Sequence, residues 1–429
     1  MQITLAMVKK TMSYRYVVFI MIALAYVLVY FHRTSIAVMT SELKAAFGVE
    51  TTAMGLFGSM YFYAYAMCQL PAGILADRWG ARKTTSLSML LASVGTLLFV
   101  MANTFNQALA SRFLVGMGVA FIYVCAMRVF ADWFKHSEFT IYNGLFVAIG
   151  NAGSLASAAP LVALMTSAGW RGAMTLIGAV TVLIALLLYI FMRNKPAEIG
   201  GASIADIEGI RVSSYANIGH IGVRESLGII IRKYNFWTIA ILFFVWYGTQ
   251  MGFQALWAGP YLMNVYHLTQ AQTGYILMFI PVGLILGCPV AGLIADKVIR
   301  SKKKVVLMGA AMSILTWLII IFMIDSMPLR MIELVMFTYG FFSAFEVVIW
   351  TNLKENIDAR IFGTGSGFTN IFVFGGAALY QQILGIIIAK APVVNNVIST
   401  SGFKSAFVFC AVSMSIAISV YATQKDYIL

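Results

Sequence analysis

Long apolar runs alternate with short polar segments along the whole chain. A helix that crosses the hydrocarbon core of a bilayer needs about 20 predominantly apolar residues, and twelve runs in the sequence approach or exceed that length. The pattern therefore predicts an all-α membrane protein with twelve transmembrane helices. The expected spans are residues 15–39, 52–76, 84–103, 107–131, 138–166, 171–192, 235–263, 271–295, 304–324, 328–350, 361–389 and 403–422.

The basic residues between these spans are distributed unevenly. Of the 29 Lys and Arg residues, 21 fall in the two termini and in the loops that follow even-numbered spans. Cytoplasmic loops carry such an excess of Lys and Arg, so we expect both termini in the cytoplasm. The net charge of +13 then reports membrane topology and contact with anionic lipids, and it does not indicate nucleic-acid binding. The five basic residues expected on the other side are Lys44, Arg171, Arg330, Lys390 and Lys404.

Composition supports the same class of protein. Hydrophobic residues make up 61% of the chain and charged residues 10%, whereas a soluble globular protein has about 25% charged residues. The four cysteines lie inside expected spans without metal-ligand spacing, so we expect neither a disulfide framework nor a metal site. The sequence shows no phosphate-binding Gly-Lys-Ser/Thr loop and no nucleophile–base arrangement. We therefore expect no cofactor, no ATP-driven pump and no enzyme.

The chain repeats itself at a constant offset of 219 residues. Residues 55–83 and 274–302 align at this offset, and Gly144 and Gly363, much further along, keep it. A constant offset over two widely spaced segments predicts two six-helix halves in the same orientation. The matching pairs within the two segments are Gly55 and Gly274, Gly73 and Gly292, and Asp77 and Asp296.

This repeat divides the chain into two bundles and a connection between them. We expect an N-terminal bundle at 1–192, a cytoplasmic linker at 193–234 and a C-terminal bundle at 235–429. The linker has some amphipathic character around 220–233, which favours attachment to the membrane surface. The alternative is a flexible tether.

Two motifs carry a resemblance to a known family. "GILADRWGARK" at 73–83 is similar at every defined position to the major facilitator superfamily signature Gly-x-x-x-Asp-Arg-x-Gly-x-Arg-Lys between spans two and three. "RFLVGMGVA" at 112–120 resembles the span-four signature of the same superfamily. With the duplicated copy at 292–303, the resemblance covers essentially the whole chain. It implies a fold of two pseudo-symmetric bundles and transport by alternating access, and it names no substrate.

The resemblance also implies a gate at the cytoplasmic face. In similar proteins the charged cluster of this loop latches the two halves together while the transporter faces outward. Asp132, at the foot of span four, is the expected partner of Arg82. The alternative is a solvated loop whose charges only set the orientation. The predicted latch consists of Asp77, Arg78, Arg82, Lys83 and Asp132, with Asp296 in the duplicated copy.

The stretch "YFHRTSIAV" at residues 30–38 places His32 and Arg33 next to each other inside the first expected span. Arg33 lies about six residues, roughly 9 Å at 1.5 Å per residue, below the outer end of that span. Arg112 lies a similar distance below the outer end of span four, and no Asp or Glu lies at this level in spans one to six. Because an unpaired charge in the membrane is expensive, we expect a cavity with an anionic ligand here. The alternative is that His32 and Arg33 reach the outer headgroup region.

The same stretch resembles span one of the organic-anion and hexuronate-type permeases of the superfamily, where an Asp-Arg pair stands in place of His-Arg. In those proteins the Arg binds the substrate carboxylate, while the Asp takes a proton and pairs with the span-four Arg. The resemblance implies that Arg33 is the carboxylate ligand, with Arg112 nearby. His32 stands at the proton-carrier position, and Val119 stands where those relatives often have Glu. An imidazole gains and loses a proton near neutral pH, so His32 is one candidate carrier.

A second pair of charges, Arg128 and Glu346, lies deeper, in the cytoplasmic halves of spans four and ten. At the offset of 219, Arg128 corresponds to Val347, one residue from Glu346. Opposite charges at these positions predict either an inner salt-bridge gate between the halves or a bipolar end of the binding site. The alternative is that each charge is satisfied within its own half. If Glu346 titrates, it is the second candidate proton carrier.

Aromatic and amide side chains recur on single faces of the expected helices. Tyr26, Tyr30 and Arg33, for example, follow the i, i+4, i+7 spacing of one helical face. Polar groups on otherwise apolar membrane helices point to a cavity or to a neighbouring helix. The predicted substrate-binding residues are Arg33, Tyr30, Arg112, Tyr61, Tyr65, Tyr247, Gln250, Gln254, Asn151, Asn370, Tyr380 and Glu346.

These features predict a proton-coupled secondary transporter of a small carboxylate-bearing metabolite. The ligand is either an organic anion bound by Arg33 and Arg112, or a zwitterionic amino acid or peptide whose ammonium also uses Glu346. Two alternatives are an exporter of amphipathic compounds and a non-transporting sensor with the same fold. We expect an integral multi-pass protein of a bacterial cytoplasmic membrane that contacts lipids and functions as a monomer.

Overall fold

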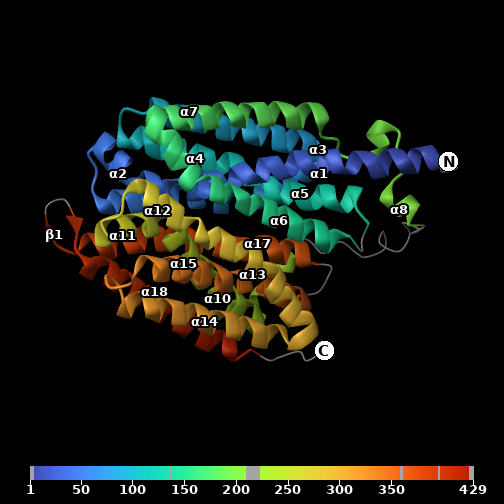
Figure 1. Cartoon of the computed structure of the whole chain (residues 1–429). Helices are drawn as coiled ribbons and strands as arrows, with labels where there is room; N and C mark the ends of the chain where they lie inside the picture. Colours follow the sequence, from blue (N-terminus) through green and yellow to red (C-terminus); the bar gives the residue numbers. More distant parts are fainter. Residues whose placement is uncertain (1–3, 136–137, 209–222, 358–360, 395–396, 425–429) are drawn as a thin grey trace.

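The computed structural model describes residues 4–135, 138–208, 223–357, 361–394 and 397–424. Helices form almost all of its regular structure, and two groups of them lie side by side (Figure 1). The predicted all-α architecture is therefore confirmed, apart from one short antiparallel pair of strands. These strands are β1 (Val393–Val394) and β2 (Val397–Ile398).

The first group, the N-terminal bundle, forms the upper part of Figure 1. The long helix α3 packs against α4, α5 and α7, and α1 packs against α6. The helices are α1 (Leu5–Thr34), α2 (Ile36–Phe47), α3 (Thr51–Met101), α4 (Phe105–Val119), α5 (Phe121–Trp133), α6 (Phe139–Ala156) and α7 (Ala159–Phe191).

The second group, the C-terminal bundle, packs mainly through α10 against α17 and through α13 against α15. Its first elements are α10 (Tyr234–Gly252), the π-helical turn η3 (Phe253–Trp257), α11 (Ala258–Val265), α12 (Gln270–Leu277), α13 (Phe279–Leu293) and the π-helical turn η4 (Ile294–Val298). The others are α14 (Lys302–Phe322), α15 (Leu329–Ser343), the 3₁₀ turn η5 (Ala344–Glu346), α16 (Val347–Asn356), α17 (Phe362–Ala389) and α18 (Thr400–Ala422).

The described parts of the connection between the bundles are attached at both ends. It contains the 3₁₀ turn η1 (Pro196–Ile199) and the helices α8 (Ile204–Ile207) and α9 (Val223–Ile231). The Thr11 hydroxyl of α1 donates a hydrogen bond of 2.8 Å to the carbonyl of Ala202, and α9 packs against α17 and α10. Part of the predicted amphipathic stretch, residues 220–222, lies outside the described residues, and attachment to the membrane surface stays a prediction.

Ten helical segments of the described residues are long and apolar enough to cross a membrane. Two expected spans, the fifth and the sixth, share the segment Ile141–Phe191. The expected span at 52–76 is helical as part of α3. The segment of α3 that is long and apolar enough to cross a membrane is Arg78–Met101, which corresponds to the expected span at 84–103. The count of twelve spans therefore stays a prediction.

Glycines allow the sharp turns between expected spans inside α3 and α7. Gly80 has φ +78° and Gly169 has φ +67°, in the left-handed region that glycine occupies without a steric penalty. In the duplicated segment the chain adopts φ +53° at Arg300, which directly follows the position equivalent to Gly80. The two halves of the repeat thus turn at nearly the same place.

The helical structure that contains the first expected span continues further than the sequence predicts. α1 ends at Thr34, and α2 follows after Ser35 and runs to Phe47. Arg33 is therefore followed by about 14 residues of nearly continuous helix, or roughly 21 Å at 1.5 Å per residue. The apolar segment itself ends at Thr34, so the depth of Arg33 in the membrane stays a prediction.

The two bundles touch at the end of the molecule that carries α2, α11 and α12, on the left of Figure 1. An added Cβ at Gly259 would lie 1.8 Å from the carbonyl oxygen of Ala37, so the two backbones are in direct contact. The side-chain Nε2 of Gln270 donates a hydrogen bond of 2.7 Å to the carbonyl of Val38. We call this end of the molecule the closed end.

Candidate functional site

Arg33 lies in the last turn of α1, and its side chain connects the two bundles. The residue is only 3% exposed. Its Nη1 donates a hydrogen bond of 3.0 Å to the hydroxyl of Tyr247, which comes from α10 of the other bundle. A buried guanidinium must find acceptors for its donors, because removing it from water is otherwise costly. The Nε of Arg33 has no hydrogen-bond partner in the described part of the chain.

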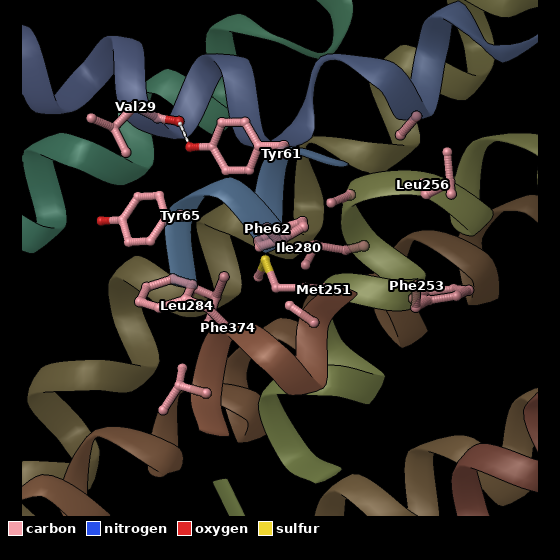
Figure 2. Close-up of a cluster of buried hydrophobic side chains, with 14 of the residues drawn as sticks. Val29, Tyr61, Phe62, Tyr65, Met251, Phe253, Leu256, Ile280, Leu284 and Phe374 are labelled. Carbon is pink, nitrogen blue, oxygen red and sulfur yellow. Dashed lines mark hydrogen bonds between the residues drawn. The ribbon is translucent and has the colours of Figure 1, made fainter. Parts of the chain in front are cut away.

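Aromatic rings supply most of the remaining surroundings of Arg33. Its Cζ lies 4.6 Å from the ring centroid of Tyr30, 5.5 Å from that of Tyr65 and 5.7 Å from that of Phe374. Tyr65 comes from α3 and Phe374 from α17, and their ring centroids are 4.0 Å apart (Figure 2). The negative face of an aromatic ring attracts a cation. These rings therefore compensate the charge without supplying hydrogen-bond acceptors.

Phe374 was missed by sequence reasoning. It lies four residues after Asn370, which was predicted to face the cavity, and i and i+4 share one face of a helix. The spacing of four residues could therefore have indicated that Phe374 lies on the same helix face as Asn370. Phenylalanine is so frequent in membrane spans, however, that the spacing alone does not distinguish a site residue from lipid-facing packing.

A second buried arginine lies close to the first. Arg112 is 4% exposed, and its Cζ is 4.8 Å from the ring centroid of Tyr61. Tyr61 interacts electrostatically with both Arg33 and Arg112, and its hydroxyl donates to the carbonyl of Val29 (Figure 2). The two arginines thus flank one tyrosine, in agreement with their predicted common level.

His32 is fully buried beside these arginines. It interacts electrostatically with Arg112. Neither ring nitrogen has a hydrogen-bond partner among the described residues. In this conformation His32 is therefore sealed from water and next to a cation, which is a poor place to accept a proton.

No carboxylate compensates the two buried arginines in the described part of the chain. Neither Arg33 nor Arg112 belongs to any of its ion pairs. An arginine pair of this kind suits a ligand that carries a carboxylate, because guanidinium and carboxylate form strong charge-assisted hydrogen bonds. The ion pairs among the described residues are Arg15–Glu138, Arg128–Asp132, Lys302–Asp296 and Arg330–Glu333.

Glu346 is the counterpart of these arginines in the C-terminal bundle. It ends the 3₁₀ turn η5 and is 8% exposed. Within the described residues, no hydrogen bond or ion pair involves its carboxyl group. A buried carboxylate without a partner is expensive in its charged form.

The helix face that carries Glu346 packs towards α10. Seven residues before it, the Tyr339 hydroxyl donates to a backbone carbonyl of α10 at 3.3 Å. Four residues after it, the ring of Trp350 lies 4.7 Å from a phenylalanine ring of α10. Glu346 lies between these two contacts and interacts electrostatically with Tyr247, the hydrogen-bond partner of Arg33. Tyr247 therefore interacts with both buried residues, Arg33 and Glu346.

Two predicted charge contacts are not formed in this conformation. Arg128 donates from Nε to Oδ2 of Asp132 at 3.3 Å, so Arg128 binds within its own bundle and not to Glu346. Arg82 donates from Nε to the carbonyl of Tyr189 at 2.7 Å and stacks on that ring at 4.8 Å. The Arg82–Asp132 pair is therefore not formed in this conformation, in which each residue has another partner nearby, and the latch stays a prediction for the outward-facing state.

A side chain from the start of the connection holds the signature loop. The backbone N–H of Arg82 donates to Oδ1 of Asn194 at 2.9 Å. An added Cβ at Gly80 would lie 2.6 Å from the same oxygen. Gly80 is thus required both for its positive φ and for the close approach of Asn194.

The other predicted latch residues make no contact between the bundles in the described part of the chain. The side chains of Arg78 and Lys83 are exposed. Asp296 is bonded to Lys302 of its own bundle. The side chain of Asp77 lies outside the described part of the structure.

Two of the predicted amides lie where the bundles meet. Asn370 donates from Nδ2 to Oε1 of Gln69 at 3.1 Å, across the two bundles. Gln254 lies on η3 and lines a small cavity of about 10 Å³ together with Thr34 and Ser154. Such a volume fits about one water molecule. These residues belong to the contact between the bundles, and no hydrogen bond of the described residues connects them to Arg33.

No hydrogen bond connects the three remaining predicted residues to Arg33 in the described part of the chain. Asn151 donates to a carbonyl of its own helix at 3.0 Å, and Gln250 is buried in α10. Tyr380 packs so closely on α10 that an added Cβ at Gly248 would lie 2.5 Å from its ring. Tyr380 therefore packs inside the C-terminal bundle in this conformation, and its place in the cavity lining stays a prediction.

Comparison with known proteins adds an independent observation. The family model of the "Major Facilitator Superfamily" matches residues 22–381. A solved structure of a bacterial homologue of the human lysosomal transporter Spinster, in an inward-facing and unoccupied conformation, superimposes with a TM-score of 0.74. The alignment covers 95% of this chain and 96% of that chain at 16% sequence identity, so it shows a shared fold.

Several curated transporters are similar in sequence. A probable L-galactonate transporter of Escherichia coli (strain K12) is 27% identical over 58% of this chain, and this match spans only 54% of that protein. A probable sulfoacetate transporter of Cupriavidus necator is 21% identical over 88% of this chain and 87% of its own. A probable galactarate/D-glucarate transporter of Escherichia coli (strain K12) is 22% identical over 96% of this chain and 94% of its own.

Proposed function

Because the chain belongs to the Major Facilitator Superfamily, we propose that it moves a small carboxylate-bearing metabolite across the membrane by alternating access. It is an integral multi-pass membrane protein and a transporter, not an enzyme. In the proposal, residues 1–192 and 235–429 are the two moving units, and residues 193–234 connect them.

The observation that carries the proposed substrate class is the buried cation between the bundles. Arg33 lies where α1 and α10 meet, with the hydroxyl of Tyr247, three aromatic rings and Tyr61 around it. No carboxylate of the described residues pairs with it. An organic anion would supply the missing acceptors, and Arg112 would add a second positive charge behind Tyr61. Three of the similar transporters are named for carboxylate-bearing compounds, which supports the same class. Others are named for hexose phosphate and for nitrate and nitrite, which are also anions or carry an anionic group.

The orientation in the membrane is part of this proposal. The excess of Lys and Arg favours twelve spans with both termini in the cytoplasm. The closed end then faces outward, and the structure represents an inward-facing state. The expected latch belongs to the opposite, outward-facing state, which accounts for the separate partners of Arg82 and Asp132 here.

We further propose that transport is coupled to protons and that Glu346 carries the proton. Its buried carboxyl group has neither cation nor hydrogen-bond donor among the described residues, so its neutral form fits the bundle better than its charged form. His32 is the other candidate, but it is sealed beside Arg112 in this conformation. Glu346 is therefore the stronger candidate.

A zwitterionic ligand is the second substrate class that a specific observation favours. The carboxylate of an amino acid or small peptide would bind Arg33, and its ammonium would bind Glu346. Tyr247 interacts with both residues, so one small ligand would reach both. Replacing Glu346→Gln separates the two classes: it should spare binding of an anion and abolish binding of a zwitterion. Retained amino-acid affinity in this variant would eliminate the zwitterion.

The test is uptake into proteoliposomes with and without an inward proton gradient. A pool of radiolabelled carboxylates, sugar acids, amino acids and dipeptides is offered to the unmodified protein, to Arg33→Ala and to Arg330→Ala. Arg330 is a matched control because its side chain is 90% exposed and lies far along the chain from the site. We expect gradient-stimulated uptake of one class that is lost in Arg33→Ala and kept in Arg330→Ala.

Other outcomes would redirect the proposal. Uptake that survives Arg33→Ala would show that the site lies elsewhere. Uptake that does not depend on the proton gradient would contradict proton coupling but would still support transport. Efflux of amphipathic dyes without any uptake would favour an exporter, and the absence of transport in both directions would favour a sensor.

A further inference from the structure

Tyr247 contributes the hydrogen bond that joins the buried cation of one bundle to the other bundle. Its hydroxyl, on α10, accepts from Nη1 of Arg33, on α1, at 3.0 Å. The ring of Tyr247 is held in place by Phe374 at a centroid distance of 5.6 Å. Bundle movement that opens the closed end must separate α1 from α10 and break this bond.

The other neighbours of Arg33 cannot supply a hydrogen-bond acceptor that is lost when the bundles separate. Tyr30, Tyr61 and Tyr65 belong to the same bundle as Arg33. Tyr30 and Tyr65 contact it through their ring faces, and Tyr61 is hydrogen-bonded to it, so none of these contacts depends on how the bundles meet. Phe374 comes from the other bundle but has no hydrogen-bond acceptor. Among the described residues, only the Tyr247 hydroxyl accepts a hydrogen bond from Arg33 across the two bundles.

This arrangement has a consequence for the carrier without substrate. Closing the outer end buries the Arg33 guanidinium, and burial without an acceptor is costly. With substrate bound, a carboxylate would supply that acceptor. Without substrate, the described part of the chain offers no carboxylate, and the Tyr247 hydroxyl occupies the position in its place.

We propose that the Tyr247 hydroxyl substitutes for the substrate carboxylate on Arg33, which allows the empty carrier to close its outer end and change sides. This inference rests on the proposed function, since it takes Arg33 to be the carboxylate ligand. It goes further by assigning a mode of transport. A carrier that changes sides while empty performs net transport, whereas one that cannot is restricted to exchanging one substrate for another.

The size of the effect follows from the type of bond. A hydrogen bond to a charged group contributes more than one between neutral groups, and its loss corresponds to about a 10- to 100-fold change in an equilibrium. Tyr247→Phe keeps the ring and its contact with Phe374 but removes the acceptor. The ratio of outer-open to outer-closed empty carrier should therefore rise by about 10- to 100-fold.

The experiment measures outer opening directly and needs no substrate. Val38, on α2, is 1% exposed and lies at the closed end, where its carbonyl accepts from Gln270. Val38→Cys is introduced into the full chain in liposomes, and its reaction with a membrane-impermeant maleimide is followed from outside. Because closing is fast compared with labelling, the labelling rate reports the open fraction. The protein without Val38→Cys corrects for the four native cysteines.

Three comparisons decide the outcome. Tyr247→Phe should raise the labelling rate about 10- to 100-fold. Tyr261→Phe is the matched control, because its buried hydroxyl bonds to the carbonyl of Ile324 within the C-terminal bundle, so its rate should not change. In the background of Arg33→Met, no cation needs an acceptor, so Tyr247→Phe should then have no effect.

The proposal is overturned if Tyr247→Phe leaves the rate unchanged. It is also overturned if Tyr247→Phe raises the rate equally in the Arg33→Met background, because the hydroxyl would then act independently of the cation. An equal rise with Tyr261→Phe would mean that any lost tyrosine hydroxyl loosens the protein. These results would leave the proposed transport activity untouched, since no substrate is present.

Discussion

The two bundles share a sequence repeat but bury charges of opposite sign that have no ion-pair partner among the described residues. The N-terminal bundle buries Arg33 and Arg112, and the C-terminal bundle buries Glu346. At the offset of 219 residues, the counterparts of the two arginines are Gly252 and Met331, which carry no charge. The repeat therefore determines the scaffold, whereas the substrate and proton chemistry lie at positions where the two copies differ.

The difference also explains why the site needs both bundles. Each bundle holds its charge without an opposite charge of its own among the described residues, and Tyr247 is placed between Arg33 and Glu346. A ligand or a proton can then change the balance between the two charges when the bundles move. We expect variants of these residues to have effects in the order that follows.

The largest effect is expected from Arg33→Ala. Truncating one partner of a buried, hydrogen-bonded charge pair costs several kcal/mol, so substrate affinity should fall by at least about 100-fold. Arg33→Lys keeps the charge but loses the planar guanidinium, and it should recover only part of the affinity. Equilibrium binding of the substrate identified by uptake measures both variants. Equal affinities for Arg33→Ala and the unmodified protein would place the anion site away from Arg33.

The second effect concerns the charge of the C-terminal bundle. Glu346→Gln removes the proposed proton site and keeps the size of the side chain. A gradient of one pH unit supports about tenfold accumulation per proton, and this accumulation should vanish in the variant. Exchange of labelled for unlabelled substrate should continue, because exchange needs no net proton movement. If proton-driven accumulation persists in this variant, His32 becomes the stronger candidate for the proton carrier.

Sequence reasoning identified the scaffold because the scaffold follows from regular patterns. The apolar runs, the basic loops and the repeat all predicted helical bundles, and the family match agrees with them. Arg33, Tyr30, Tyr65 and Tyr247 were also predicted, since charged and aromatic residues on one helix face stand out in apolar spans. The structure brings these four together.

The contacts that the sequence did not reveal depend on conformation or on non-local packing. The pairing of Arg82 with Tyr189 depends on where the chain returns at the end of α7, and no local spacing encodes this. Tyr380, like Tyr247, is a tyrosine in an otherwise apolar span, but its ring packs closely against Gly248 inside the C-terminal bundle. The spacing of residues in the sequence predicts which side chains share one face of a helix. Which neighbouring helix packs on that face depends on the three-dimensional arrangement of the bundles.

A third effect should appear in the kinetics of Tyr247→Phe. If the hydroxyl allows the empty carrier to change sides, the variant should lose net uptake by about tenfold while exchange remains nearly unchanged. The measurement compares uptake into empty liposomes with uptake into liposomes preloaded with the same substrate. Parallel losses in both assays would indicate that Tyr247 binds substrate and has no separate role in the empty carrier.

The smallest effect is expected from Gln270→Ala, which removes a neutral hydrogen bond between the same two bundles. Its Nε2 donates to the carbonyl of Val38 at the partly exposed closed end. A neutral hydrogen bond contributes about 1 kcal/mol, so the outer-open fraction should rise only about fivefold. The labelling rate of Val38→Cys measures this change on the same scale as Tyr247→Phe. A shift as large as that of Tyr247→Phe would show that closure depends on the number of contacts at the closed end, and that the buried charge of Arg33 carries no special weight.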